Sequence, residues 1–233
     1  MKARTPPRLQ TSSQGAKDEW SELADKYLYL LLNRERQQAA RLIHELVEKQ
    51  EDLRNIYLRI FQESQREIGR LWQTNQVTVA QEHYCTAATQ QIMSQLYPYI
   101  FAATPGDRKM VMACASAELH ELGARMVADF FEMAGWDTYY LGANVPAESI
   151  LSEVRASGAN LLGLSVALPD KIPLVANVIE ELHSAGFERP VTVLVGGRPF
   201  NIDPELWRKV GADGYAPDAS AAIARADELV PKK

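Results

Sequence analysis

The stretch Glu118-Leu119-His120-Glu121-Leu122-Gly123 joins two segments of contrasting pattern. Before it, residues 109–115 (KMVMACA) form an apolar run typical of a buried strand, and after it residues 124–134 have the spacing of an amphipathic helix. The stretch is therefore expected to be a strand-to-helix turn at the carboxyl end of a strand, where open α/β sheets bind ligands. A lone histidine in such a turn is more often a helix cap or a surface residue than a ligand. Whether His120 is a ligand must therefore be judged from motifs elsewhere in the chain.

Short apolar runs alternate with helical periods throughout residues 108–233. We expect strands at 109–115, 137–141, 161–167, 191–195 and 214–216. Helices are expected between and after them, at 124–134, 147–157, 172–185, 204–210 and 219–230. Buried strands that are rich in valine and leucine, each followed by a helix, predict a five-stranded parallel sheet with helices on both faces, and hence an α/β domain.

Residues 17–103 show only helical periodicity. Helices are expected at about 18–31, 36–49, 51–73 and 78–102, the last one broken or kinked near Pro98. Four antiparallel helices with short connections predict a four-helix bundle. The turn-rich residues 104–107 (TPGD) are expected to link the two domains, and residues 1–16, rich in Ser, Thr, Gln and Pro, are expected to be a disordered lead-in.

Composition narrows the classes of function. The formal charge of −5 argues against a nucleic-acid surface, which needs a basic face. No run of 18 apolar residues and no signal peptide is visible, so no membrane association is expected. Cys85 and Cys114 lie in apolar patterns without metal-ligand spacing, which predicts buried thiols of a cytoplasmic protein.

Three elements of the second domain together resemble a known family. Glu118-x-His120-x-x-Gly123 resembles the Asp-x-His-x-x-Gly motif of cobalamin-binding domains in which histidine replaces the base of the cofactor as the lower cobalt ligand. Ser165-Val166-Ala167-Leu168 and Gly196-Gly197 follow at the spacing of that family's Ser-x-Leu and Gly-Gly elements. Glu118 stands in place of aspartate, and Ala167 stands where leucine is usual, with Leu168 one position later. The resemblance implies a Rossmann-like (flavodoxin-like) fold and a bound cobalamin.

The resemblance also implies a role for each motif residue. His120 would coordinate cobalt, with Glu118 accepting a hydrogen bond from its other ring nitrogen. The displaced dimethylbenzimidazole tail would pass Gly123 and enter the sheet between the first and last helices of the domain, where Ser165 would hydrogen-bond the base. Gly196-Gly197 would let the backbone approach the nucleotide. Further residues expected to bind the cofactor are Leu119, Tyr140, Val145, Ala167 and Leu168.

The helical domain contains Trp72, then nine residues, then Glu82-His83. In the simplest interpretation Trp72 ends one helix, and Glu82 and His83 begin the next, with the acidic group favoured near a helix N-terminus. The spacing also resembles the Trp-x9-Glu-His motif of cobalamin photoreceptors, which implies that Trp72 caps the upper-ligand pocket and that Glu82 and His83 line it. The chain departs from that family at Gln73, where a histidine is usual, and shows no DNA-binding domain ahead of the helices.

These resemblances lead to two hypotheses. The first is a light sensor, not an enzyme, that binds adenosylcobalamin and signals by movement of the bundle to a downstream protein or by a light-dependent homo-oligomer. A bilin such as biliverdin is a candidate second chromophore. The second hypothesis is a corrinoid protein that carries methyl groups for a methyltransferase system. The Trp72-x9-Glu82-His83 spacing favours the sensor, and the absence of an output module favours the carrier.

Overall fold

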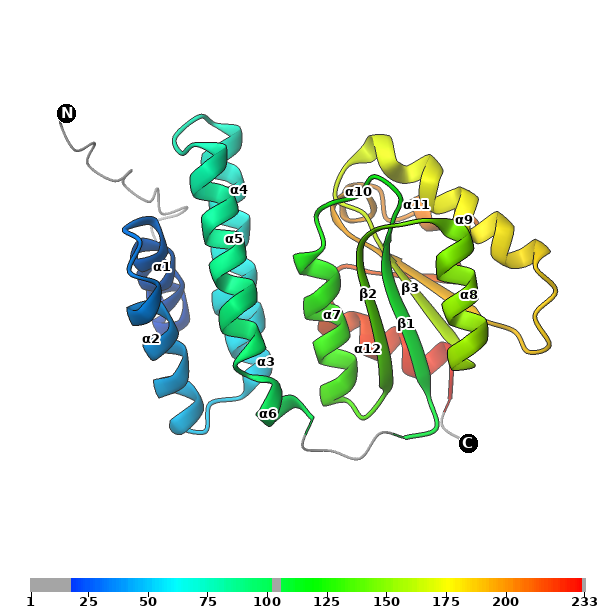
Figure 1. Cartoon of the computed structure of the whole chain (residues 1–233), viewed down its shortest axis with the longest axis horizontal. Helices are drawn as coiled ribbons and strands as arrows, with labels where there is room; N and C mark the ends of the chain where they lie inside the picture. Colours follow the sequence, from blue (N-terminus) through cyan, green and yellow to red (C-terminus); the bar gives the residue numbers. More distant parts are fainter. Residues whose placement is uncertain (1–17, 102–105, 232–233) are drawn as a thin grey trace. The chain divides into compact units, whose positions relative to one another are not determined.

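The computed structural model describes residues 18–101 and 106–231 and divides the chain into two compact units, with the boundary between Tyr97 and Pro98 (Figure 1). The expected lead-in, residues 1–16, and the first half of the expected linker, Thr104 and Pro105, lie outside the described residues. Within the described part of the chain, no helix is both long enough and apolar enough to cross a membrane.

The first unit is helical. Its elements are α1 (Glu19–Leu32), α2 (Arg36–Glu48), α3 (Leu53–Asn55), the π-helix η1 (Ile56–Phe61), α4 (Gln62–Gln73) and α5 (Val79–Ser94). The elements α3, η1 and α4 follow one another without a break, as expected for the segment 51–73. The expected last helix is broken near Pro98, as predicted: α5 stops at Ser94, and a separate short helix, α6 (Tyr97–Ile100), contains Pro98. Proline lacks the amide hydrogen that a continuous helix requires.

The core of the helical unit combines aromatic packing with a buried chain of hydrogen bonds. The ring of Phe61 lies 5.6 Å from the ring of Tyr27 and 5.3 Å from that of Tyr57, and all three side chains are fully buried. The hydroxyl of Tyr27 is 3.0 Å from that of Thr89, which also accepts a hydrogen bond from the amide of Gln65. Buried polar groups need such partners, and these bonds tie α1 and α4 to α5.

The second unit contains one sheet of five parallel strands, as predicted. The strands are β1 (Lys109–Ala115), β2 (Asp137–Val145), β3 (Leu161–Ser165), β4 (Thr192–Gly196) and β5 (Gly214–Ala216), in the order β2-β1-β3-β4-β5. The loops that follow β1 and β3 therefore lie side by side, at the point where the strand order reverses. That crevice at the carboxyl ends of the strands is where doubly wound sheets bind ligands.

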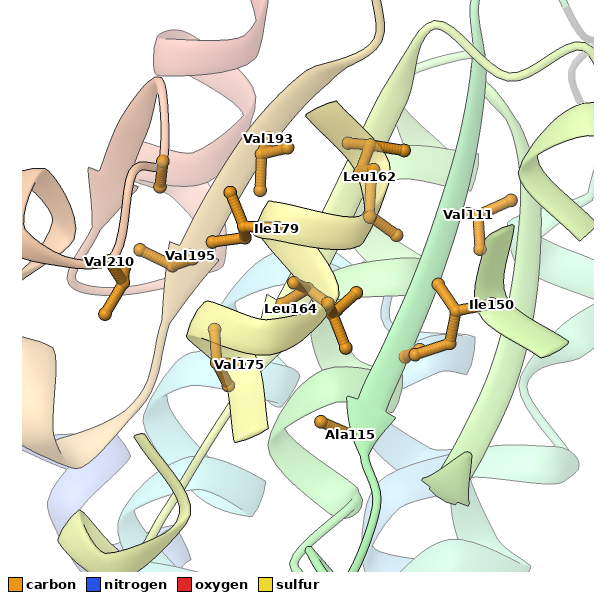
Figure 2. Packing of buried hydrophobic residues seen from close by; sticks show 14 of the residues in the cluster. Val111, Ala115, Ile150, Leu162, Leu164, Val175, Ile179, Val193, Val195 and Val210 are labelled. Atoms are coloured by element: carbon orange, nitrogen blue, oxygen red, sulfur yellow. The ribbon is translucent and has the colours of Figure 1, made fainter. Parts of the chain in front are cut away.

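Helices cover both faces of the sheet (Figure 1). The helices α8 (Ala147–Ser157) and α9 (Ile172–Ser184) pack on one face, and α7 (Leu122–Met133) and α12 (Ala219–Leu229) pack on the other. The layer beneath α8 and α9 is filled by branched aliphatic side chains such as Val111, Leu164 and Ile179, as Figure 2 shows. Burial of such side chains supplies most of the driving force for folding.

Some predicted elements differ from the structure. The expected strand 161–167 ends at Ser165. The strand β2 continues to Val145, beyond the expected end at residue 141, because the backbone turns with positive φ at Gly142 and Asn144 and shifts the register against β1 without ending it. The expected helix 204–210 is shortened to α11 (Leu206–Lys209), and a further short helix, α10 (Arg198–Ile202), precedes it. Pro199 is favoured in the first turn of α10, and Pro204 lies between the two helices.

Candidate cofactor site

The loop after β1 places a buried carboxylate against an accessible imidazole. One oxygen of Glu118, Oε1, accepts hydrogen bonds from Nδ1 of His120 at 2.7 Å and from the backbone N–H of His120 at 2.9 Å. Glu118 is 1% exposed, whereas the side chain of His120 is 51% exposed. Because an ionised carboxylate only accepts hydrogen bonds, Nδ1 carries the proton, and Nε2 is the nitrogen with a lone pair for a metal.

The second oxygen of Glu118 reaches across the crevice. Oε2 accepts a hydrogen bond from the backbone N–H of Ala167, in the loop after β3, at 2.8 Å. Burial pushes the pKa of Glu118 upward, but the hydrogen bonds from His120 and from the N–H of Ala167 outweigh it and lower the pKa to about 2. Glu118 is therefore ionised in the folded protein and connects the two loops that form the crevice.

The end of β2 is fixed to the loop after β1 by two residues with positive φ. Ala117 and Asn144 both have positive φ, 61° and 55°, although neither is glycine. The side-chain oxygen of Asn144 accepts the N–H of Ala117 at 2.8 Å, and the N–H of Asn144 donates to the carbonyl of Glu118 at 2.9 Å. These bonds hold the end of β2 against the Glu118 loop and offset the cost of the left-handed conformation.

Glu121 is a residue of the site that the sequence interpretation missed. Its carboxylate accepts the N–H of Ala143 at 3.0 Å and the hydroxyl of Tyr140 at 3.2 Å. Burial, together with the charge of Glu121, raises the pKa of Tyr140. A Cβ at Gly142 would lie 3.0 Å from the same carboxylate, so this glycine leaves room for it. The sequence signal for this part of the site was Gly142, directly after the expected strand 137–141, since glycine in a strand often marks a bulge.

Exposed apolar side chains lie on the two loops that carry His120 and Ala167. Leu119 is 70% exposed and Leu168, beside the Glu118–Ala167 contact, is 39% exposed. Val145 is half-buried, and the hydroxyl of Ser116 donates to its carbonyl at 3.4 Å. Gly123 lies in the first turn of α7, and a Cβ there would meet no atom within 4 Å. An oriented imidazole with an apolar rim suits a flat, largely apolar macrocycle that carries a metal.

The serine and glycine elements meet below this rim. Ser165 is paired with Cys114 on one side and with Gly196 on the other, at the carboxyl ends of β1, β3 and β4. Gly197 has φ +106°, and a Cβ there would lie 1.9 Å from the carbonyl oxygen of Val166. Glycine at 197 is therefore required by the backbone of this chain, as well as suited to a ligand that approaches closely.

Trp72, Glu82 and His83 belong to the helical unit. Trp72 lies near the end of α4 and is 42% exposed. Thr78 begins α5 with a capping box, and Glu82 and His83 follow in its first turns. Nδ1 of His83 donates to Glu82 at 2.5 Å, and Thr86 donates to the other oxygen of Glu82 at 3.0 Å. A helix, a short turn and a capped helix are sufficient to produce the spacing of these residues.

Both units match models of known families. Residues 108–224, half of the chain, match a family described as B12 binding domain, and residues 23–97 match a second model with the same description.

The curated relatives are corrinoid proteins. Dimethylamine corrinoid protein 1 of Methanosarcina acetivorans is 31% identical over 122 residues, which are 52% of this chain and 56% of that protein. Dimethylamine corrinoid protein 2 of Methanosarcina mazei is 32% identical over 130 residues, 55% of this chain and 59% of that protein. The chain thus spans little more than half the length of these relatives.

Two solved structures are similar over most of the chain. The monomethylamine corrinoid protein of Methanosarcina barkeri has a TM-score of 0.78 at 19% identity, covering 90% of this chain and 99% of that one. The methanol:cobalamin methyltransferase complex of Methanosarcina barkeri has a TM-score of 0.50 at 16% identity, covering 91% and 81%. At these identities the likeness shows the fold.

The prediction of a light sensor is wrong. The relatives are methylamine corrinoid proteins and not photoreceptors, and the similar structures include a methyltransferase complex. The prediction relied on the spacing of Trp72, Glu82 and His83, which ordinary helix capping also produces. The expected bilin and the light-dependent oligomer were parts of that hypothesis and have no support among these relatives.

The expectation of a corrinoid cofactor is confirmed at the level of the family. The oriented imidazole of His120, the apolar rim around it and the glycine-lined strands below fit such a cofactor. The matched model covers the whole of this site, from the start of β1 to α12. The chain belongs to the B12 binding domain family.

Proposed function

We propose that this chain is a corrinoid protein that carries a methyl group between the enzymes of a methyltransferase system. The observation that carries the proposal is the pairing of the His120 imidazole with the buried carboxylate of Glu118. The names of the relatives, which are dimethylamine and monomethylamine corrinoid proteins, support the methyl-carrying role. When bound, the corrinoid supplies the cobalt that accepts and releases the methyl group.

The residues of the chain hold and orient this cofactor. His120 would coordinate the cobalt through Nε2, and Glu118 fixes the tautomer and the ring orientation. Leu119 and Leu168, which are both exposed, would cover apolar surface of the corrinoid and exclude water from it. Tyr140, Val145 and Ala167 hold the neighbouring loops in place through the hydrogen bonds described above. None of these residues needs to move a proton, because the chain carries the group and does not activate it.

The same proposal covers the tail of the cofactor. The nucleotide would pass Gly123, where an added Cβ would meet no atom within 4 Å, and its base would enter the sheet layer beneath α7 and α12. Ser165 provides a hydroxyl for the base, since a buried ring nitrogen without a partner is costly. Gly196 and Gly197 allow close approach of the nucleotide at the ends of β4 and its loop.

We infer that the helical unit is a four-helix bundle. The contacts that support this are those of α1 with α2, α4 and α5, and the continuity of α3, η1 and α4 as one rod. Trp72, Glu82 and His83 remain predicted cofactor-binding residues. Replacement of Trp72 by alanine tests this prediction, because it removes an exposed ring that makes little contribution to the core of the unit.

The names of the curated relatives support a class of methyl donor. They are dimethylamine corrinoid proteins, so we expect a methylamine as the methyl source and a methyltransferase, not a signalling protein, as the partner. A methyl carrier is expected to use methylcobalamin or the reduced cofactor, in place of the adenosylcobalamin expected for a sensor.

The test is the absorption spectrum and affinity of the protein titrated with methylcobalamin and with adenosylcobalamin. Methylcobalamin is expected to bind at least as tightly and to show the spectrum of a displaced base with histidine bound. His120→Ala should lose this spectrum, and His183→Ala, which changes an exposed histidine at the end of α9, should keep it. Binding of adenosylcobalamin alone, or an unchanged spectrum in His120→Ala, would overturn the proposal.

A further inference from the structure

The two faces of the sheet are packed with different kinds of side chain. Beneath α8 and α9 the buried layer consists mainly of valine, isoleucine and leucine. Beneath α7 and α12 it is rich in alanine and contains two methionines and two aromatic rings. The alanines are Ala124, Ala128, Ala216, Ala222 and Ala226, the methionines are Met110 and Met112, and the rings are Phe131 and Trp136, with Cys114, Leu161 and Leu194 completing the layer. The small residues bring the helices close to the sheet.

The alternation of β3 locates this space. Side chains alternate between the faces of a strand, and Leu161 faces α7 and α12, so Gly163 and Ser165 share that face. Gly163 is paired with Met112 on β1, and Ser165 is paired with Cys114. Gly163 therefore leaves a slot without a side chain on this face, about 7 Å from Ser165 toward the amino end of β3.

Two thioether groups fill the slot. A Cβ at Gly163 would lie 2.3 Å from Cε of Met110 and 2.5 Å from Sδ of Met112, so the ends of both methionines occupy the place of the missing side chain. Both methionines are nearly fully buried, at 0% and 3% exposure. Methionine is unbranched and has three rotatable side-chain bonds, and it is the residue that most readily refills an irregular space.

The other groups of this layer are less able to refill the slot than the two methionines. Leu161 and Leu194, the partner of Gly163 on β4, are branched and have one side-chain torsion fewer than methionine. The alanines have no side-chain torsion to change, and Phe131 and Trp136 pack edge to face with their centroids 5.1 Å apart. Both rings are fully buried. If a flat ring enters this layer below Ser165, the two methionine ends are the groups that must withdraw.

We propose that Met110 and Met112 form a movable filling that admits and selects the lower base of the corrinoid. The inference rests on the proposed function, since it concerns the nucleotide tail of the same cofactor. The thioether ends occupy the slot over Gly163 and swing toward the amino ends of the strands when the base enters next to Ser165. The size of base that the protein accepts is set by how far these two side chains withdraw.

The first test uses the unaltered protein with methyl-labelled methionine. Cobalamin and cobinamide share the corrin ring, but cobinamide lacks the nucleotide and its base. Cobalamin is expected to shift the methyl resonances of Met110 and Met112 strongly, whereas cobinamide leaves them near their starting positions. Equal shifts with both corrinoids, or none with cobalamin, would overturn the inference.

The second test replaces the two methionines with a less flexible side chain. Isoleucine is branched at Cβ and is restricted in χ1, so Met110→Ile combined with Met112→Ile keeps the layer apolar but prevents withdrawal. The affinity for cobalamin should fall at least tenfold, and the affinity for cobinamide should stay within twofold of the original protein. Val111→Ile is the matched control, because Val111 lies between the two methionines on β1 and faces the opposite layer. Loss of affinity for both corrinoids in equal measure would contradict the inference.

The two proposals fail in different ways. If the unaltered protein binds neither cobalamin nor cobinamide, the corrinoid function itself is wrong. The protein can instead bind cobalamin and cobinamide through His120 while both tests give the same result for the two corrinoids. In that case the corrinoid function stands and the proposed movement of Met110 and Met112 is wrong.

Discussion

Glu118 has one methylene more than the aspartate of the motif that it resembles, and the structure shows where the extra length goes. One oxygen orients His120, and the other reaches the N–H of Ala167. Ala167 is also the position where the serine element departs from the usual pattern. Both departures lie at this contact, but the N–H is a backbone group that any residue except proline would offer at position 167.

Replacement of Glu118 by glutamine tests its role in orienting the ligand. The glutamine side chain has one acceptor oxygen where glutamate has two, so either the bond to His120 or the bond to Ala167 is lost. Loss of the group that orients a metal-binding histidine typically lowers affinity roughly 10- to 100-fold. Titration with cobalamin, followed by absorbance, measures this change. Glu148→Gln, on the exposed side of α8, is the control and should bind as the original protein does.

Cys85 makes the stability of the protein sensitive to alkali. Burial raises the pKa of its thiol from 9.0 to about 12, and the charge of Glu82 acts in the same direction. Above pH 9 the unfolded chain releases this proton while the folded chain keeps it, so the free energy of unfolding falls between pH 9 and pH 12. At pH 10 the loss is roughly 1.4 kcal/mol. Urea denaturation at pH 8 and pH 10 should show a smaller loss for Cys85→Ala, and identical losses would contradict the assignment.

At the scale of single elements, the start of α5 depends on Thr78. Its side chain accepts the N–H of Gln81, and the side chain of Gln81 accepts the N–H of Thr78. Thr78→Ala should lower the free energy of unfolding by about 1 kcal/mol, and Thr78→Ser should restore most of it. Chemical denaturation followed by circular dichroism measures both. Ser94→Ala, at the other end of the helix, is expected to have little effect, because its hydroxyl bonds back to the carbonyl of Gln90 and does not cap the helix start.

The turn after β4 depends on Gly197 for a steric reason. Gly197→Ala would combine a positive φ with a contact of 1.9 Å to a backbone oxygen, and backbone cannot move aside as a flexible side chain can. The expected cost is roughly 3 kcal/mol or more. Gly158→Ala is a suitable comparison, because φ is also positive there and no atom lies within 4 Å of the added Cβ. That variant should lose about 1 kcal/mol, and an equal loss in both variants would show that the contact relaxes.

The elements that could be predicted are those whose pattern depends on burial alone. The strand 109–115 and the helix 147–157 have the predicted bounds, because continuous apolar runs and amphipathic spacing reflect how the chain is buried. The end of β2 could not be predicted, because the left-handed conformation of Asn144 is stabilised by bonds to a loop distant in sequence. Tertiary contacts of this kind leave no periodic signal.

At the scale of the whole molecule, each unit has its own core, and the groups of the proposed cofactor site that surround His120 all lie within residues 106–231. A fragment of residues 106–233 should therefore fold and bind cobalamin with histidine coordination. Absorbance and circular dichroism of the fragment measure this, with His120→Ala in the same fragment as the control. A fragment that folds but binds no cobalamin would show that residues before 106 are needed for binding.

The sequence interpretation was right about the family of the second domain and wrong about the light-sensing use and the bilin. The spacing of Glu118, His120, Ser165 and the glycine pair led to that family, and the matched model confirms it. The role of the helical unit was inferred from Trp72 and Glu82-His83, whose spacing reflects a helix hairpin and carries no information about light. What a bound cofactor is used for depends on partner proteins that this chain does not encode.

The hydrogen bond from Ala167 to Glu118 also bears on how this site can be engineered. The donor is a backbone N–H, so the bond depends on where the loop after β3 places its main chain and not on the side chain at position 167. A designer who transplants the loop of residues 116–121 into another corrinoid domain should therefore move residues 165–168 with it. The two loops then keep the spacing that brings this N–H to the carboxylate of Glu118, and with it the orientation of the imidazole.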